Sequence, residues 1–102
     1  MDKKIKIEVQ YFNGCPNSPE MIHRVKEAIK GIEKIEYNEV LVESNELAEE
    51  IKFRGSPTVL IDGEDIEGRK EPESASLNCR VYENGLPSID EIKEKILSNN
   101  QV

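Results

Sequence analysis

Cys15 is the residue whose type and position in this sequence best suit chemistry. It follows a stretch that alternates apolar and polar residues and precedes an amphipathic one, so it stands where a strand is expected to give way to a helix. A thiol at the start of a helix lies near unpaired backbone N–H groups and the positive end of the helix dipole, and both favour the thiolate. The thiolate is the form that attacks disulfides and binds metals. We therefore expect a functional role, and the alternative is a small, part-buried residue of a tight turn.

Few other side chains in this sequence could take part in chemistry. Cys79 is the second of two cysteines. Cys79 could act with Cys15 in redox chemistry or metal binding. The alternative is that it packs in a loop as a small hydrophobic residue. His23 is the single histidine, and it falls off the apolar stripe of the first predicted helix. We expect it at the solvated surface.

Length and charge narrow the classes of function. A chain of 102 residues with no internal repeat is expected to form a single domain, residues 1–102. Its net charge of −7 makes nucleic acid and anionic membranes poor partners. It has no apolar run long enough to span a bilayer and no signal-peptide pattern. Two cysteines are too few for a secreted disulfide scaffold, so the predicted compartment is the cytoplasm.

The first half of the chain shows the elements that must position Cys15. Residues 4–11 alternate apolar and polar side chains, which is typical of a strand with one buried face. A helix follows with either Cys15 or Ser18 as its N-cap residue. Residues 35–42 form a second strand, and its continuously apolar later part predicts burial on both faces. The apolar stripe of the helix contains Met21, Ile22, Val25, Ala28, Ile29 and Ile32.

The second half of the chain continues with shorter elements. Residues 68–87 form a long polar connection that holds Cys79. A capping box at residues 88–91 opens a last helix, whose apolar face contains Ile89, Ile92, Ile96 and Leu97. The elements before the connection are predicted as a helix capped by Ser44, a strand over 56–61, a hairpin turn at Asp62-Gly63 and a return strand over 64–67.

Three short motifs occur in an order and spacing that resemble the thioredoxin-like superfamily. They are Gly14-Cys15-Pro16-Asn17-Ser18, Gly55-Ser56-Pro57-Thr58-Val59, and the hairpin dipeptide Asp62-Gly63. The predicted order βαβαββα also resembles that superfamily, over nearly the whole chain. The later Cys79-Arg80-Val81-Tyr82 is similar to a segment of small thioredoxin-like proteins that carry Gly-Cys-Pro-Asn. The resemblance implies an α/β domain with a four-stranded mixed sheet and helices on both faces.

The resemblance also implies roles for individual residues. Cys15 matches the attacking cysteine of the family's Cys-X-X-Cys motif, and Pro57 matches the cis-proline that faces it. Ser56, Pro57 and Thr58 would align a substrate chain through backbone contacts. Ser18 stands where the second cysteine of the motif belongs. Its hydroxyl can hydrogen-bond a Cys15 thiolate, but it cannot resolve a mixed disulfide because that step needs a second thiol.

Connectivity offers Cys79 as the missing thiol. In a sheet of this kind the third strand runs antiparallel to the first, so Pro57 lies near Cys15. The connection after the fourth strand then leaves from the same side of the molecule. A disulfide between Cys15 and Cys79 can form if their Cα atoms come within about 7 Å of each other.

Three functions follow as hypotheses. In the first, the chain is a thiol–disulfide oxidoreductase without a cofactor: Cys15 attacks, and Cys79 or an external thiol resolves the mixed disulfide. Its partner would be a small thiol or a protein that contains a thiol or disulfide. In the second, the two thiolates bind a soft metal, Cu(I) or Hg(II), because zinc usually needs four ligands. In the third, the fold is a non-catalytic interaction module, which the missing second cysteine of the motif favours.

Overall fold

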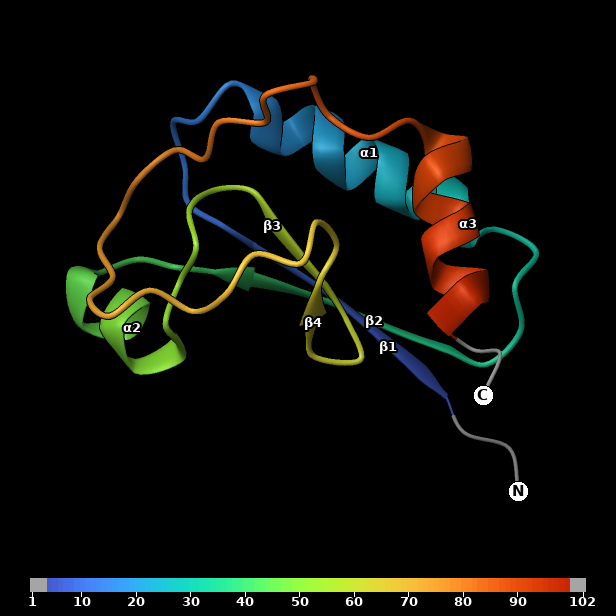
Figure 1. Cartoon of the computed structure of the whole chain (residues 1–102), viewed down its shortest axis with the longest axis horizontal. Coiled ribbons are helices and arrows are strands. Elements are labelled where there is room, and N and C mark those ends of the chain that lie inside the picture. Colours follow the sequence, from blue (N-terminus) through green and yellow to red (C-terminus); the bar gives the residue numbers. More distant parts are fainter. Residues whose placement is uncertain (1–3, 100–102) are drawn as a thin grey trace.

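The computed structural model describes residues 4–99, which form a mixed four-stranded sheet and three helices (Figure 1). The sheet order is β2-β1-β3-β4, with β1 and β2 parallel and the pairs β1–β3 and β3–β4 antiparallel. This mixed α/β architecture confirms the predicted order of elements. No helix within this range is long and apolar enough to cross a membrane. The elements are β1 (Ile5–Tyr11), α1 (Asn17–Ile29), β2 (Ile35–Leu41), α2 (Asn45–Ile51), β3 (Thr58–Ile61), β4 (Glu64–Asp65) and α3 (Ile89–Asn99).

The main core lies between one face of the sheet and the helices α1 and α3, which lie close together in Figure 1. The alternation predicted for β1 places its odd-numbered apolar residues on this face. The apolar faces of α1 and α3 pack against these residues. The buried side chains of this cluster include Ile5, Ile7, Val9, Met21, Val25, Ala28, Val59, Ile61, Ile92 and Ile96.

A second, smaller cluster lies on the opposite face, under α2. Val40 of β2 stands opposite Gln10 of β1 in the register, so it points away from the main core. Val40, Val42 and Phe12 pack around the buried Ala48 and Phe53, and the rings of Phe12 and Phe53 meet edge to face at 6.3 Å. Helices therefore cover both faces of the sheet, as predicted.

Three predictions about the strands are wrong in detail. β3 begins at Thr58 instead of residue 56, since the backbone of Ser56 pairs with Asn78 and Arg80. β2 is an edge strand whose residues are partly or fully exposed, because α2 covers only the cluster at its carboxyl end. The return strand β4 is Glu64–Asp65 instead of residues 64–67. A turn ends it, since the Asp65 carboxylate accepts a hydrogen bond from the Glu67 N–H at 2.8 Å and the Asp65 carbonyl accepts one from Gly68.

Local signals set the starts of α2 and α3 as expected. The Ser44 hydroxyl accepts a hydrogen bond from the Leu47 N–H and caps α2. The capping box of α3 is reciprocal: the Ser88 hydroxyl accepts from the Glu91 N–H at 3.1 Å, and the Glu91 carboxylate accepts from the Ser88 N–H at 2.9 Å. These bonds hold the pKa of the Glu91 carboxyl below its ordinary value.

Replacement of Ser88 by alanine should destabilise the protein by about 1 kcal/mol, because the Glu91 N–H loses its acceptor at the start of α3. Chemical denaturation of Ser88→Ala measures the change. Ser98→Ala is the matched control, since Ser98 is an exposed serine of the same helix. An equal, small effect of both substitutions would contradict the role of the cap.

Candidate redox site

Cys15 and Cys79 form a disulfide, with their Cα atoms 5.7 Å apart. The distance meets the condition derived from connectivity. Cys15 lies just before α1 and is 4% exposed, whereas Cys79 lies in the connection between β4 and α3 and is exposed. The connection passes from beside α2 to the amino end of α1 (Figure 1). The structure therefore joins the two cysteines at the edge where both were expected.

Backbone hydrogen bonds to Ser56 hold the neighbours of Cys79. The Ser56 N–H donates to the Asn78 carbonyl, and the Arg80 N–H donates to the Ser56 carbonyl, both at 2.8 Å. Ser56 and Cys79 thus form an isolated parallel bridge. Cys79 is fixed by bonds on either side of it, and neither of them involves its sulfur.

The side chains after Cys79 alternate as in a strand. Arg80 and Tyr82 are buried, at 4% and 6% exposure, whereas Val81 is 72% exposed. The Tyr82 hydroxyl donates to the Pro57 carbonyl at 2.6 Å. Cys79 is exposed like Val81, because a residue two positions along an extended segment points to the same side.

Arg80 and Asp65 form a buried ion pair with two hydrogen bonds, at 2.6 and 2.8 Å. The two side chains are 0% and 1% exposed. The guanidinium also lies over the ring of Tyr82, 4.7 Å from its centroid. Burial by itself raises the pKa of Asp65, but hydrogen bonds from Arg80 and from the Glu67 N–H bring that pKa below its ordinary value.

Gly55 lets this segment come close to the start of β3. A Cβ atom at residue 55 would lie 2.8 Å from the Arg80 Cβ and 3.1 Å from its Cα. Gly55 also has a φ of +105°, which side chains rarely tolerate. Any other residue would push Arg80, and with it Cys79, away from Ser56.

The start of α1 differs from both predictions. The helix begins at Asn17, and its N-cap position is Pro16, without a capping side chain. Ser18 does not cap it: its hydroxyl is hydrogen-bonded to the Ser56 hydroxyl at 2.7 Å, inside the protein. The Ser56 hydroxyl also accepts from the Phe12 N–H at 3.1 Å. Ser18 and Ser56 therefore tie the start of α1 to the end of β1 and to the start of β3.

The helix dipole favours a Cys15 thiolate, but fewer backbone donors face it than the sequence pattern suggested. Pro16 and Pro19 have no N–H. The Ser18 N–H already donates to the Cys15 carbonyl at 3.2 Å. The dipole of α1 still favours negative charge at this position.

The predicted substrate-aligning residues Ser56, Pro57 and Thr58 are all buried. The Ser56–Pro57 peptide bond is cis, as the resemblance implies. Residues 78–82 occupy the backbone groups that were expected to hold a substrate: Asn78 and Arg80 pair with Ser56, and the Tyr82 hydroxyl binds the Pro57 carbonyl. Thr58 pairs with Gln10 inside the sheet.

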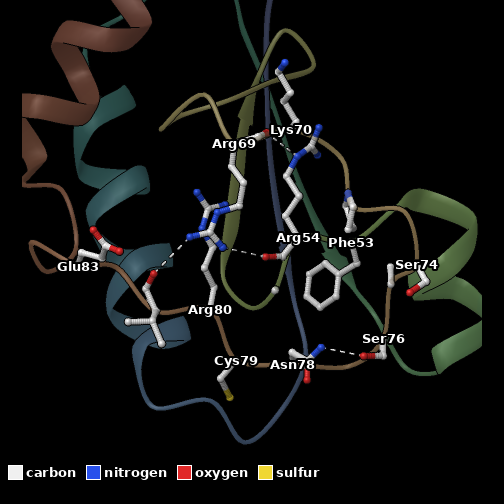
Figure 2. A pocket seen from close by; sticks show the side chains of 14 residues that line it. Phe53, Arg54, Arg69, Lys70, Ser74, Ser76, Asn78, Cys79, Arg80 and Glu83 are labelled. Atoms are coloured by element: carbon white, nitrogen blue, oxygen red, sulfur yellow. Dashed lines mark hydrogen bonds between the residues drawn. The ribbon is translucent and has the colours of Figure 1, made fainter.

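A pocket of about 440 Å³ lies beside residues 78–81, which form part of its lining. Figure 2 shows Arg54, Arg69 and Lys70 at one end of it, and the Cys79 sulfur pointing away from it. The Arg54 Nε donates to the Arg69 carbonyl at 2.9 Å, so the Arg54 guanidinium lies against the backbone of Arg69. Phe53 and Asn78 also line it. The pocket therefore lies beside the redox pair without containing its sulfurs.

The described part of the chain contains no site with three or more metal ligands. Between residues 4 and 99, no group of three or more His, Cys, Asp or Glu side chains is placed to hold a metal ion. His23 is exposed on α1, as expected. Binding of a soft metal by Cys15 and Cys79 would require the reduced protein, because in the disulfide both sulfurs are already bonded.

Sequence reasoning missed the residues that anchor Cys79. Gly55 and Arg80 were noted only as parts of motifs and Asp65 only as part of a return strand, and Ser56 was expected to contact a substrate. The alternation in Cys79-Arg80-Val81-Tyr82 was a signal for an extended segment with one buried face. An arginine on the buried side hid this signal, since arginine is rarely buried without a partner and the partner lies far away in the sequence.

Comparison with known proteins does not assign the chain to a family. No protein-family model matches the chain, and no curated protein matches it. Its class is therefore described by its own architecture: a mixed α/β domain with a disulfide between the start of its first helix and its last long connection.

Replacement of Gly55 by alanine should destabilise the protein by roughly 1–3 kcal/mol more than replacement of Gly85. Both glycines have positive φ, but a Cβ at Gly85 meets nothing within 4 Å. Gly85→Ala therefore controls for backbone strain alone. Urea denaturation measures both variants, and equal losses would contradict the close approach of Arg80 to Gly55.

Asp65 should make stability depend on acid pH. The pKa of the Asp65 carboxyl is lower in the folded chain than in the unfolded chain. Its ionised form therefore stabilises the fold fully above the unfolded carboxyl pKa of about 4. This stabilisation is lost as the pH falls through the folded pKa. Asp65→Asn should cost about 3 kcal/mol at pH 7, because Arg80 loses its buried counter-charge.

Denaturation of wild type and Asp65→Asn between pH 7 and pH 2 would measure both effects. The gap between the two proteins should narrow below about pH 4. Glu64→Gln is the matched control, since Glu64 is the exposed neighbour in β4. A gap that stays constant with pH would contradict a charged Asp65 in the fold.

Proposed function

We propose that this protein is a thiol–disulfide oxidoreductase whose redox centre is the pair Cys15 and Cys79. One observation carries the proposal: a disulfide joins a buried cysteine at the start of α1 to an exposed cysteine on a separately anchored segment. The partner would be a small thiol, or a protein that contains a thiol or a disulfide. A thioredoxin-like identity belongs to the same proposal and is supported by the element order and the Cys15–Pro57 motifs.

The pair can exchange electrons without a cofactor. Two partner thiols, R–SH, reduce the Cys15–Cys79 disulfide to two thiols and become R–S–S–R, so two electrons and two protons pass to the protein. The reverse reaction oxidises the pair and reduces a partner disulfide. The dipole of α1 favours the thiolate of Cys15, so Cys15 supplies a nucleophile for closing the disulfide.

The anchors of Cys79 support a pair that closes again after reduction. The bonds to Ser56 and the ion pair between Arg80 and Asp65 do not involve either sulfur. They keep Cys79 close to Cys15 when the disulfide is open, and an intramolecular thiol held in place reacts at a high effective concentration. Cys79 thus supplies the second thiol that Ser18 cannot.

Binding of a soft metal is the second candidate, for the reduced form. Cα atoms 5.7 Å apart place two thiolates within reach of one ion, and Cu(I) or Hg(II) accepts two sulfur ligands. Metal bound in both single-cysteine variants as tightly as in the wild type would remove this candidate. The interaction module remains the alternative for a chain whose thiols do not exchange.

The reduced protein should reduce 5,5′-dithiobis(2-nitrobenzoate) and end as the Cys15–Cys79 disulfide, releasing both coloured thiolates. In Cys15→Ser and in Cys79→Ser the reaction should stop at a mixed disulfide, with one thiolate released, because the second thiol is missing. Absorbance and intact mass follow the reaction. Asn84→Ser, in the same connection, is the control and should behave like wild type. A reduced wild type that stops at two mixed disulfides would contradict a working pair.

A further inference from the structure

We propose that Cys79 is the sulfur that exchanges with outside partners, and that Cys15 acts only inside the protein, as the thiolate that attacks Cys79. This assignment rests on the proposed function and gives each cysteine of the pair a distinct role. It departs from the role that the resemblance implies for Cys15, which is direct attack on a substrate. Three observations on the oxidised protein lead to it.

The first observation is the difference in exposure. A thiolate attacks a disulfide along the S–S axis, from the side opposite the sulfur that leaves. Attack on Cys15 would have to come through its buried side, since the residue is only 4% exposed. Attack on Cys79 comes from solvent, because Cys79 is exposed. Access therefore selects Cys79.

The second observation is that the chain fills its own substrate-aligning position. An extended partner could be guided to Cys15 by the backbone N–H and carbonyl of Ser56, but Asn78 and Arg80 already hold both. Arg80 is fixed in turn by Asp65, inside the protein. A partner would have to displace a buried ion pair to reach this position, whereas Cys79 is already exposed.

The third observation concerns the leaving group. When an outside thiolate bonds to Cys79, the electron pair of the broken S–S bond passes to the Cys15 sulfur. That sulfur lies at the amino end of α1, where the helix dipole favours negative charge. Cys79 comes near this end of α1 from a separate connection, whereas Cys15 directly precedes the helix. The better leaving group is therefore Cys15, and the sulfur that stays bonded to the partner is Cys79.

The full cycle then has two steps in each direction. In reduction, R–S⁻ attacks Cys79 and releases the Cys15 thiolate; a second R–S⁻ attacks the partner sulfur of the mixed disulfide and releases R–S–S–R and the Cys79 thiolate. In oxidation, the Cys79 thiolate attacks R–S–S–R and expels R–S⁻. The Cys15 thiolate then attacks the Cys79 sulfur, expels the second R–S⁻ and closes the disulfide.

Trapping of the first mixed disulfide on the wild-type protein tests the assignment. The oxidised protein is mixed with a limiting amount of reduced glutathione, quenched in acid, alkylated with N-ethylmaleimide and mapped by peptide mass spectrometry. Glutathione should be found on Cys79, and N-ethylmaleimide on Cys15, about tenfold or more in excess of the reverse pattern. The same reaction in concentrated urea is the control and should label the two cysteines about equally, because unfolding exposes Cys15.

Each other outcome has a distinct meaning. Glutathione mainly on Cys15 would overturn the assignment and leave the oxidoreductase in place. The same preference for Cys79 in urea would also overturn it, since local sequence and not burial would then select the sulfur. A disulfide that glutathione does not open under either condition would overturn both the assignment and the proposed function.

A pair of variants gives an independent measurement on the reduced protein. Cys15→Ser keeps Cys79, and Cys79→Ser keeps Cys15, so their rates of reaction with oxidised glutathione compare the two sulfurs directly. The variant that keeps Cys79 should react faster. A faster reaction of the variant that keeps Cys15 would contradict the assignment, because Cys79→Ser leaves the start of α1 tied to Ser56 through Ser18 and should leave Cys15 buried.

Discussion

The attachment of residues 78–82 to the start of β3 is the interaction on which the site depends. The backbone pairing with Ser56 sets the position of this segment, and the ion pair of Arg80 with Asp65 holds it from the inner side. Without this attachment, Cys79 would be one residue of a long connection that contains no helix or strand. With it, two cysteines far apart in the sequence lie close enough to bond.

The choice of residues in this attachment follows from the cost of burying charge. A buried carboxylate and guanidinium lose their hydration, and the pair is tolerated only when its geometry is good and its hydrogen bonds are made. The planar guanidinium of Arg80 can bond both oxygens of Asp65 and lie over the Tyr82 ring at the same time, which a lysine cannot do. The pair also fixes the register. A slip of one residue would bury Cys79 and expose Arg80, so the ion pair decides which side chain faces the solvent.

The same attachment shapes the chemistry that the site can perform. It joins an exposed cysteine to a buried one and occupies the backbone groups of Ser56 that an outside chain could use. The Cys79 sulfur also points away from the pocket that has Arg54, Arg69 and Lys70 at one end. A domain whose Cys-X-X-Ser motif lacks a second thiol thereby gains one from a distant part of the chain.

The sequence by itself determined the features that depend on neighbouring residues. The alternation of residues 4–11, the caps at Ser44 and Ser88 and the turn at Asp62-Gly63 each act over a few residues, so the order of elements could be predicted from them. The position of Cys15 before a helix followed in the same way. The strand directions that the resemblance implied went one step further, because they put the connection that holds Cys79 on the same side of the molecule as Cys15.

Only the tertiary structure decided which side chains meet across the fold. Sequence spacing does not show that Arg80 turns inward to Asp65, that Gly55 leaves room for it, or that Ser18 bonds Ser56 in place of capping its helix. The exposure of β2 depends likewise on where α2 comes to lie. These contacts join residues distant in sequence, and their free energies depend on burial and geometry that exist only once the elements have packed.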